Sequence, residues 1–186
     1  MGTDAHLISK HLQGDRQASQ ALVERYQDLV YSLAWRMLGD GEEARDAAQE
    51  VFLSALEALP RFRGESAFST WLYRIAANTC ITRSKLRRQR RTREVPAEDW
   101  DPPDEHSPSS LELVEQGQRD HLLHQAVAEL PEPYRLVIVL HYFQELTGAQ
   151  VAQVLKVPEG TVKARLFRAQ RLLQRKLNTR GERKYR

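Results

Sequence analysis

Apolar residues along the chain recur mainly at spacings of three and four, whereas strict alternation over four to eight residues is hard to find. This pattern predicts an all-α protein. A first long helix begins near Asp15 and ends at Gly39 and Asp40. A second helix is closed by Pro60, and a third follows the loop of residues 62–66 and runs into a basic segment. Together they predict one compact helical domain, residues 1–93.

The helical periodicity disappears between residues 94 and 110. Four prolines stand there among acids and serines, a composition that cannot bury enough apolar surface to become ordered: Pro96, Pro102, Pro103 and Pro108. We therefore predict a flexible acidic linker, residues 94–110.

Helical pattern resumes in residues 111–186, which we predict to be a second domain. Its expected segments are an apolar stretch from Leu111 through Leu113 and Val114 to Leu130, a short helix after Pro131 that includes Leu136, Val137 and Leu140, a helix from about Thr147 to Leu155, and a last helix from about Pro158 to Leu177. The predicted fold is two small helical domains joined by an acidic, proline-rich linker.

Charge is segregated along the chain, although the formal net charge is only +3. Residues 1–60 hold 5 Lys/Arg and 10 Asp/Glu, residues 83–93 hold 7 Lys/Arg and no acid, residues 94–105 hold 6 acids and no base, and residues 161–186 hold 10 bases and one acid. Two separate basic segments favour contact with a polyanion at two places, because neutralising phosphates releases counterions. The alternative is an ordinary solvated surface.

The single cysteine excludes an internal disulfide and any multi-thiolate metal site, which is typical of a reducing compartment. Cys80 lies beside the inward stripe of the third helix, so packing is favoured over a redox role. No apolar run approaches the roughly 20 residues of a membrane span, and the N-terminus does not resemble a signal peptide. We expect a cytoplasmic protein without membrane insertion, cofactor or metal.

The last two predicted helices carry the strongest local motif. Thr147 and Gln150 have the Thr-x-x-Gln form of a capping box, so a helix can begin there. The helix after it has one apolar stripe, made of Val162, Leu166, Ala169 and Leu173. Its other side carries Lys163, Arg165, Phe167, Arg168 and Arg171. This arrangement predicts a helix-turn-helix, whose second helix enters the DNA major groove; a plain helical hairpin is the alternative.

A second cluster combines aromatic, basic and amide side chains around the start of the third helix. Its members are Arg61, Phe62, Arg63, Phe68, Trp71, Tyr73, Arg74 and Asn78. Aromatic rings can stack on unpaired bases, arginines can hold the phosphate backbone, and an amide can read a base edge. Capture of single-stranded nucleic acid is one interpretation. The other is that the aromatic residues belong to the core, as the inward stripe indicates for Phe68 and Trp71.

These segments resemble a known family. The run ARDAAQEVF at residues 44–52, with RFRG at 61–64 and FSTWLYRIAANT at 68–79, is similar to conserved region two of the extracytoplasmic-function (ECF) sigma factors. LPEPYR at residues 130–135, with GTVKARLFRA at 160–169, resembles their region four. Order and spacing agree over about residues 18–178.

The resemblance implies an alternative sigma factor, with three interfaces and no catalytic site. Core RNA polymerase, through the clamp helices of its largest subunit, would be bound by Asp46, Gln49, Glu50 and Phe52, and its flap by region four. The minus-ten promoter element would be bound by Phe62, Arg63, Gly64, Phe68, Arg74 and Asn78. The minus-thirty-five element would be bound by Thr161, Lys163, Ala164, Arg165, Phe167, Arg168 and Arg171. An anti-sigma factor, often linked to the membrane, is a further expected partner.

Three positions depart from the family pattern. Arg45 stands where an acid is frequent and bears on polymerase affinity, while Thr82 stands where Asp is frequent and bears on backbone contacts near the minus-ten element. Gln150 replaces a usual Glu, and little change is expected because Gln also closes a capping box.

Three alternative functions are weaker. A stand-alone DNA-binding regulator would need a sensory domain with strands and a pocket in residues 1–93, and the sequence predicts neither. A nuclease could use Glu43, Asp46 and Glu50 as a metal-binding face, although solvated charge explains these acids better. A zinc site at His121 and His124 would lack further ligands.

Overall fold

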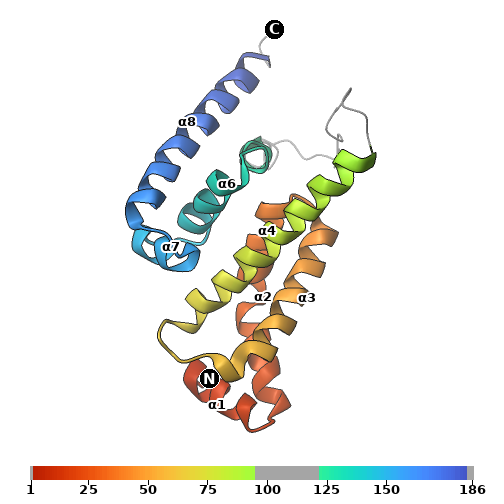
Figure 1. Cartoon of the computed structure of the whole chain (residues 1–186), viewed down its shortest axis with the longest axis vertical. Coiled ribbons are helices and arrows are strands. Elements are labelled where there is room, and N and C mark those ends of the chain that lie inside the picture. Colours follow the sequence, from red (N-terminus) through yellow and green to blue (C-terminus); the bar gives the residue numbers. More distant parts are fainter. Residues whose placement is uncertain (1, 95–121, 184–186) are drawn as a thin grey trace, which may run out of the picture.

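The computed structural model describes residues 2–94 and 122–183, and over these ranges it contains helices and no strand (Figure 1). Glu94, the first residue of the predicted linker, is the last residue of a helix. The rest of the predicted linker, together with Leu111, Leu113 and Val114, lies outside the described residues.

The N-terminal half consists of α1 (Asp4–Leu12), α2 (Arg16–Leu38), α3 (Gly41–Ala58), the short 3-10 turn η1 (Leu59–Arg61) and α4 (Phe68–Glu94). Both ends of α2 agree with the prediction. Asp15 caps its start by accepting from the amides of Gln17 and Ala18, and Gly39 ends it in the left-handed conformation, with φ of 73°. Helix α1 was not predicted, because nine residues are too short to show a helical period.

Helices α2, α3 and α4 pack side by side around fully buried apolar side chains (Figure 1). Val30 and Leu33 come from α2, Val51 comes from α3, and Leu72 and Cys80 come from α4. α1 packs on α2, where Arg25 and Tyr26 both bond the Asp4 carboxylate.

The C-terminal half contains a helical segment at residues 122–128, α6 (Glu132–Ile138), the π-helical turn η2 (Val139–Phe143), α7 (Gly148–Leu155) and α8 (Glu159–Arg183). The predicted capping box is present: the Thr147 amide donates to Gln150 Oε1 at 2.8 Å, and the Gln150 amide donates to Thr147 Oγ1 at 3.3 Å. The substitution of Gln for Glu therefore preserves the box, as predicted. The apolar stripe of α8 also faces inward, with Val162 and Ala169 fully buried.

The middle of the segment from α6 into η2 is buried on every side. Residues 136–140, with the sequence LVIVL, are five consecutive buried positions. A helix that is apolar all round is enclosed by its neighbours, and α6 and η2 contact α8 on one side and α2 on the other. The short helix predicted here is therefore a central element of the molecule.

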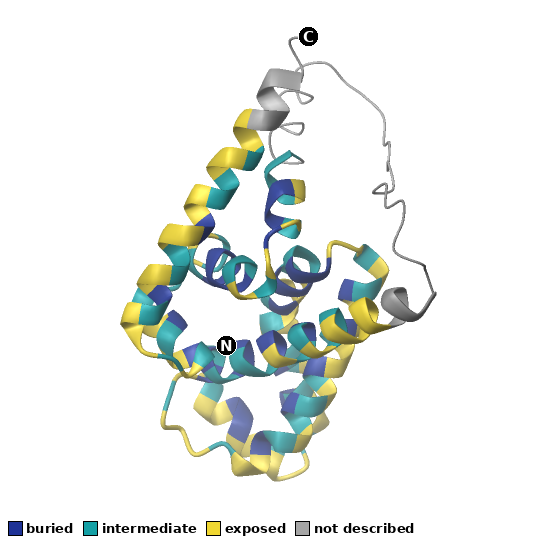
Figure 2. Ribbon diagram, turned by 45° about the horizontal axis from the view of Figure 1, so that its top comes forward, coloured by how far each residue is buried: buried dark blue, intermediate teal, exposed yellow. Residues whose placement is uncertain are grey.

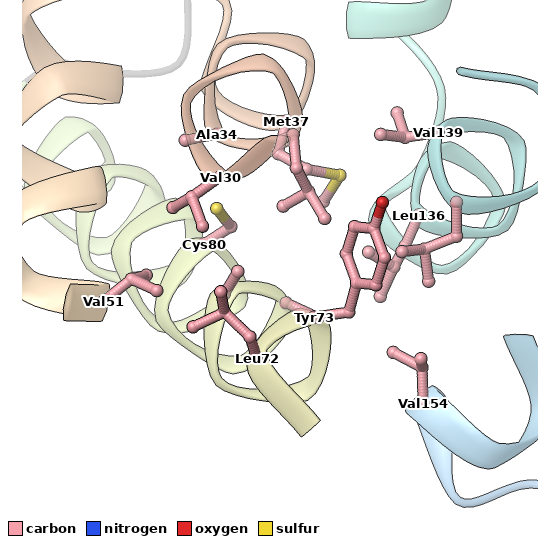
Figure 3. Packing of buried hydrophobic residues seen from close by; sticks show 14 of the residues in the cluster. Val30, Ala34, Met37, Val51, Leu72, Tyr73, Cys80, Leu136, Val139 and Val154 are labelled. Carbon is pink, nitrogen blue, oxygen red and sulfur yellow. The ribbon is translucent and has the colours of Figure 1, made fainter. Parts of the chain in front are cut away.

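The N-terminal and C-terminal helices share one hydrophobic core. Met37 and Tyr73 from the first group meet Leu136, Val139 and Val154 from the second (Figure 3). Figure 2 shows that the buried residues lie on the sides of the helices that face one another, with exposed residues outside. The all-α fold is confirmed. The boundaries of the two predicted domains stay a prediction, and the two halves are packed together.

Candidate polymerase and nucleic-acid interfaces

Helix α3 presents a polar face to solvent. Ala44, Ala47, Val51 and Ala55 are buried, which leaves Asp46, Gln49 and Glu50 exposed on the opposite side. Leu53 lies on the same face, three and four residues after Glu50 and Gln49, and 65% of it is exposed. Phe52, which the sequence placed in the polymerase interface, is half-buried and packs against the core. The most exposed large apolar side chain of this face is therefore Leu53.

Two acids of α3 form ion pairs with α4. Arg83 Nε donates to Glu50 at 2.8 Å, and Arg87 donates to Glu43 at 3.0 Å and also to the Leu38 carbonyl. These pairs join the acidic helix to the basic segment and account for two of the three acids in the nuclease alternative. Within residues 2–94 and 122–183, no group of three or more acid, histidine or cysteine side chains is placed to hold a metal.

Four aromatic rings form a cluster at the start of α4. Phe68 contacts Tyr26, Phe62 and Trp71, with ring centroids 5.2, 5.9 and 5.5 Å away, and Phe62 and Trp71 are 5.1 Å apart. Phe68 is 7% exposed, whereas Phe62 and Trp71 are half-buried. The core interpretation therefore applies to Phe68, and capture of nucleic acid by the cluster stays a prediction. Phe68 is a core residue, and the partly exposed rings of Phe62 and Trp71 pack against it.

The loop between η1 and α4 adds polar groups beside this cluster. Gly64 has φ of 71°, and no heavy atom lies within 4 Å of the place that a Cβ would take, so its backbone conformation, and not space, favours glycine. Arg63 is exposed and pairs loosely with Glu65, at 3.9 Å. Asn78 is exposed on α4. Arg74 differs from these residues, because its guanidinium donates to the Gln153 carbonyl of α7 at 2.8 Å.

Helix α8 leaves its predicted DNA-reading side uncovered. Lys163, Ala164, Phe167, Arg168 and Arg171 are exposed, and Thr161 and Arg165 are half-buried. Phe167 is 60% exposed, and the Arg171 guanidinium lies 5.8 Å from the centre of its ring. The Lys163 ammonium pairs with Glu159 one turn earlier, at 3.0 Å. The exposed side of α8 therefore combines an aromatic ring with cations, which are side chains that can contact bases and phosphates.

Cys80 is fully buried, and this burial raises the pKa of its thiol to about 12. Reactive thiols are exposed and have lowered pKa values, so the packing role predicted for Cys80 is the one its surroundings favour. His124, the described member of the zinc alternative, stacks on Trp35 with ring centroids 3.7 Å apart. His121 lies outside the described residues.

Membrane insertion was not expected, and none of the helices in the described ranges is both long and apolar enough to span a bilayer.

Comparison with known proteins identifies the class. Residues 22–92 match the Sigma-70 region 2 family, and residues 120–173 match Sigma-70, region 4. The chain is 38% identical to the RNA polymerase sigma-H factor of Pseudomonas aeruginosa, covering 94% of this chain and 93% of the relative. It is 36% identical to the ECF RNA polymerase sigma factor SigW of Bacillus subtilis, covering 91% and 94%.

Its fold is similar to that of the sigma factor RpoE in a co-crystal structure with the anti-sigma factor NepR from Bartonella quintana, with a TM-score of 0.67, 20% identity, and 86% and 96% of the two chains covered. The helix-turn-helix and the aromatic cluster are thus parts of a transcription initiation factor. The chain belongs to the ECF group of sigma-70 RNA polymerase sigma factors.

Proposed function

We propose that this chain binds core RNA polymerase, directs it to promoters with a particular pair of elements, and stabilises the opened DNA. The observation that carries the proposal is the exposed side of α8 in the helix-turn-helix. Phe167 lies there together with three exposed cations, Lys163, Arg168 and Arg171. That surface recognises duplex DNA, and a second, aromatic surface at α4 suits unpaired bases.

The polymerase surface is the exposed face of α3. Asp46, Gln49 and Glu50 supply acid and amide groups for a basic partner, and Leu53 supplies apolar area that becomes buried on binding. Phe52 supports this face from beneath, because it packs against the core. The flap of the polymerase is the proposed partner of the C-terminal helices.

The minus-ten surface is the aromatic cluster with its neighbouring loop. Phe62 and Trp71 offer ring faces to flipped bases, while buried Phe68 holds them in place. Arg63 and the Gly64 backbone lie in the adjoining loop, and Arg74 and Asn78 lie along α4. Unstacking a base costs a few kcal/mol, and stacking on an aromatic ring returns roughly 1–3 kcal/mol, so capture by this surface can stabilise melting.

The minus-thirty-five surface is the exposed side of α8. Lys163, Arg165, Arg168 and Arg171 can bond guanine acceptors or phosphates, and Phe167 and Ala164 can contact thymine methyl groups. Thr161, in the first turn, can bond a phosphate. The chain acts by binding alone, and the chemistry belongs to the polymerase.

The chain acts in the cytoplasm, where an anti-sigma factor regulates it. That partner is located at the membrane. RpoE, a sigma factor of similar fold, was crystallised with an anti-sigma factor. An anti-sigma factor would act by covering the α3 face or by holding the two DNA-reading surfaces in an arrangement that does not fit a promoter.

The test is run-off transcription from a promoter library with purified core RNA polymerase, with and without the chain. Initiation at a shared two-element sequence only when the chain is present is the expected result. Specific binding of the chain alone to duplex DNA, without any effect on transcription by the core enzyme, would replace the proposal with a stand-alone regulator.

A further inference from the structure

A tyrosine that is not among the predicted site residues packs beneath the aromatic cluster of the minus-ten surface. Tyr26, from α2, meets Phe68 edge to face, with ring centroids 5.2 Å apart and ring planes at 64°. Phe68 in turn contacts Phe62 and Trp71, the two partly exposed rings proposed to stack on bases. The inference that follows rests on the proposed function, because it concerns what holds this surface in shape.

The two partly exposed rings leave no room for a base between them. The centroids of Phe62 and Trp71 are 5.1 Å apart, and their planes are tilted by 51°. A base inserted between two rings needs them roughly 7 Å apart, which is twice the rise of about 3.4 Å between stacked bases. A base must therefore stack on the outer face of one ring, so its binding depends on how that ring is oriented and how firmly it is held.

The hydroxyl of Tyr26 is fixed by the N-terminal helix α1. It donates to Asp4 Oδ2 at 2.6 Å, while Arg25 donates to the other carboxylate oxygen of Asp4 and, at 2.7 Å, to the Gly2 carbonyl. Hydrogen bonds to a carboxylate are about twice as strong as those between neutral groups. Burial and the bond to Asp4 both raise the pKa of Tyr26, so its hydroxyl remains a donor at neutral pH. Tyr26 is therefore held at both ends, by Phe68 and by Asp4.

Helix α1 also reaches the loop beside the cluster. Its buried residues Leu7 and Ile8 belong to the hydrophobic core, and α1 contacts both α2 and η1, the turn that leads into the loop of residues 62–66 (Figure 1). It therefore supports the minus-ten surface at two places, through Tyr26 and through η1. The range that matches Sigma-70 region 2 begins at residue 22, so α1 lies outside it.

We propose that α1 is a positioning element for the minus-ten surface and acts through the hydrogen bond between Asp4 and Tyr26. This bond fixes the Tyr26 ring, the Tyr26 ring fixes Phe68, and Phe68 fixes the two rings that stack on unpaired bases. Asp4 and Tyr26 are positioning residues, since they act on the rings and not on the DNA. Their loss weakens the contribution of the bases to binding and leaves the contribution of the phosphate backbone unchanged.

The test measures binding of single strands by the holoenzyme, which is the full chain with core RNA polymerase. One strand carries the minus-ten sequence found by run-off transcription, and each of the others lacks one of its bases. Fluorescence anisotropy gives the dissociation constants, and the ratio of abasic to intact strand measures capture of that base. A chain that is merely destabilised has a smaller binding-competent fraction, which weakens all strands equally and leaves the ratio unchanged.

Tyr26→Phe removes the hydroxyl and keeps the ring. It should lower the ratio about fivefold at the base that stacks on the cluster, because part of the stacking contribution is lost, and should leave the affinity for the strand that lacks this base unchanged. Asp4→Asn should have a similar effect. The double variant should show no greater fall than either single variant, since all of them weaken one and the same bond.

Ser19→Ala is the matched control. The Ser19 hydroxyl and His11 Nδ1 are 2.7 Å apart, so this pair also joins α1 to α2 by one side-chain hydrogen bond, at the opposite end of α1 from Asp4. The ratio for Ser19→Ala should equal that of the unmodified chain. A fall as large as that of Tyr26→Phe would show that any loosening of α1 has the same effect, and it would overturn the route through Tyr26.

The outcomes separate this inference from the proposed function. Undiminished ratios in Tyr26→Phe and Asp4→Asn, in a holoenzyme whose unmodified form distinguishes intact from abasic strands, would overturn the positioning role and leave the sigma-factor proposal intact. A chain that does not bind core polymerase, or an unmodified holoenzyme that binds intact and abasic strands equally, would overturn the proposed minus-ten surface and this inference with it.

Discussion

At the scale of single residues, neighbouring positions on α3 have opposite surroundings. Phe52 packs against the core, whereas Leu53 is 65% exposed beside Gln49 and Glu50. A leucine left in solvent at the centre of a polar face gains free energy when a partner covers it. The structure thus adds Leu53 to the proposed polymerase surface and gives Phe52 a supporting role.

Leu53→Asp should weaken binding to core polymerase about tenfold, because the loss of a central apolar contact typically costs roughly 1–2 kcal/mol. Fluorescence anisotropy of a labelled chain titrated with core enzyme measures this. Leu12→Asp is the control, since Leu12 is 52% exposed on α1 and lies outside the proposed surfaces. Equal weakening by both substitutions would argue against a specific role for Leu53.

Cys80 should make stability depend on alkaline pH. Burial raises the pKa of its thiol from the ordinary 9.0 to about 12. Above pH 9 the unfolded chain loses this proton before the folded chain does, so stability is complete below pH 9 and falls as pH rises toward 12. The slope from this one proton reaches at most about 1.4 kcal/mol per pH unit.

Urea unfolding at pH 8 and pH 10 measures the effect, and Cys80→Ala should show a smaller fall between these two values. Burial also raises the pKa of Tyr73, to about 12, but tyrosine contributes only above its ordinary value of 10.0. An identical fall in both chains would show that Cys80 is not the titrating group.

At the scale of elements, the helix-turn-helix depends on a local cap as well as on packing. Thr147 and Gln150 exchange hydrogen bonds at the start of α7. Because α7 has only eight residues, this cap is a large share of its local hydrogen bonding. The end of α7 at Lys156 is left-handed, with φ of 53°, and it turns the chain toward α8. The orientation of the DNA-reading helix therefore follows from both ends of α7.

Thr147→Ala should lower the free energy of unfolding by about 1 kcal/mol, since one amide of the first turn loses its acceptor. Thermal unfolding followed by circular dichroism measures the change. Thr147→Ser keeps a hydroxyl and should restore most of the loss. If serine were no better than alanine, the methyl group, not the cap, would account for the effect.

Arg168→Ala should reduce promoter-specific transcription and leave binding to polymerase unchanged, because Arg168 is exposed on the DNA-reading side of α8. Lys176→Ala is a control of equal charge on the same helix, since Lys176 pairs with Glu129 at 2.7 Å. Parallel loss of polymerase binding and transcription in the Arg168 variant would remove this residue from the DNA interface.

At the scale of the whole molecule, the enclosed segment from α6 into η2 couples the two halves. Val139 is fully buried in the core that the two groups of helices share (Figure 3). Removing its methyl groups leaves a cavity that neither half can fill alone. A substitution in the C-terminal sequence should therefore weaken the N-terminal helices as well.

Val139→Ala should cost about 2 kcal/mol and increase amide hydrogen exchange at the end of α2 as well as in α6. Val162→Ala is a matched control, because Val162 is also fully buried but belongs to the stripe of α8. If α2 exchange did not respond to either variant, the two halves would not be coupled in the free chain.

Particular elements show which structural features the sequence predicted and which it did not. Asp15 and Gly39 marked the ends of α2, and Thr147 with Gln150 marked the start of α7, because caps and turn residues act within a few positions. The run LVIVL carries a signal of complete burial that a prediction from helical period alone overlooks. The site residues stay predictions, and the exposure of Leu53 and the engagement of Arg74 were not anticipated.

The sequence by itself determined the helical fold, the apolar faces of the helices, the segregation of charge and the family, since these properties depend on local spacing and on motif order. Only the tertiary structure decided that the two halves pack together, and which of their residues meet. Gln144 and Tyr73 are 71 residues apart, and Arg135 and Met37 are 98 apart. Such pairs follow from the packing of whole helices, in which many weak contacts act together, and no local pattern encodes them.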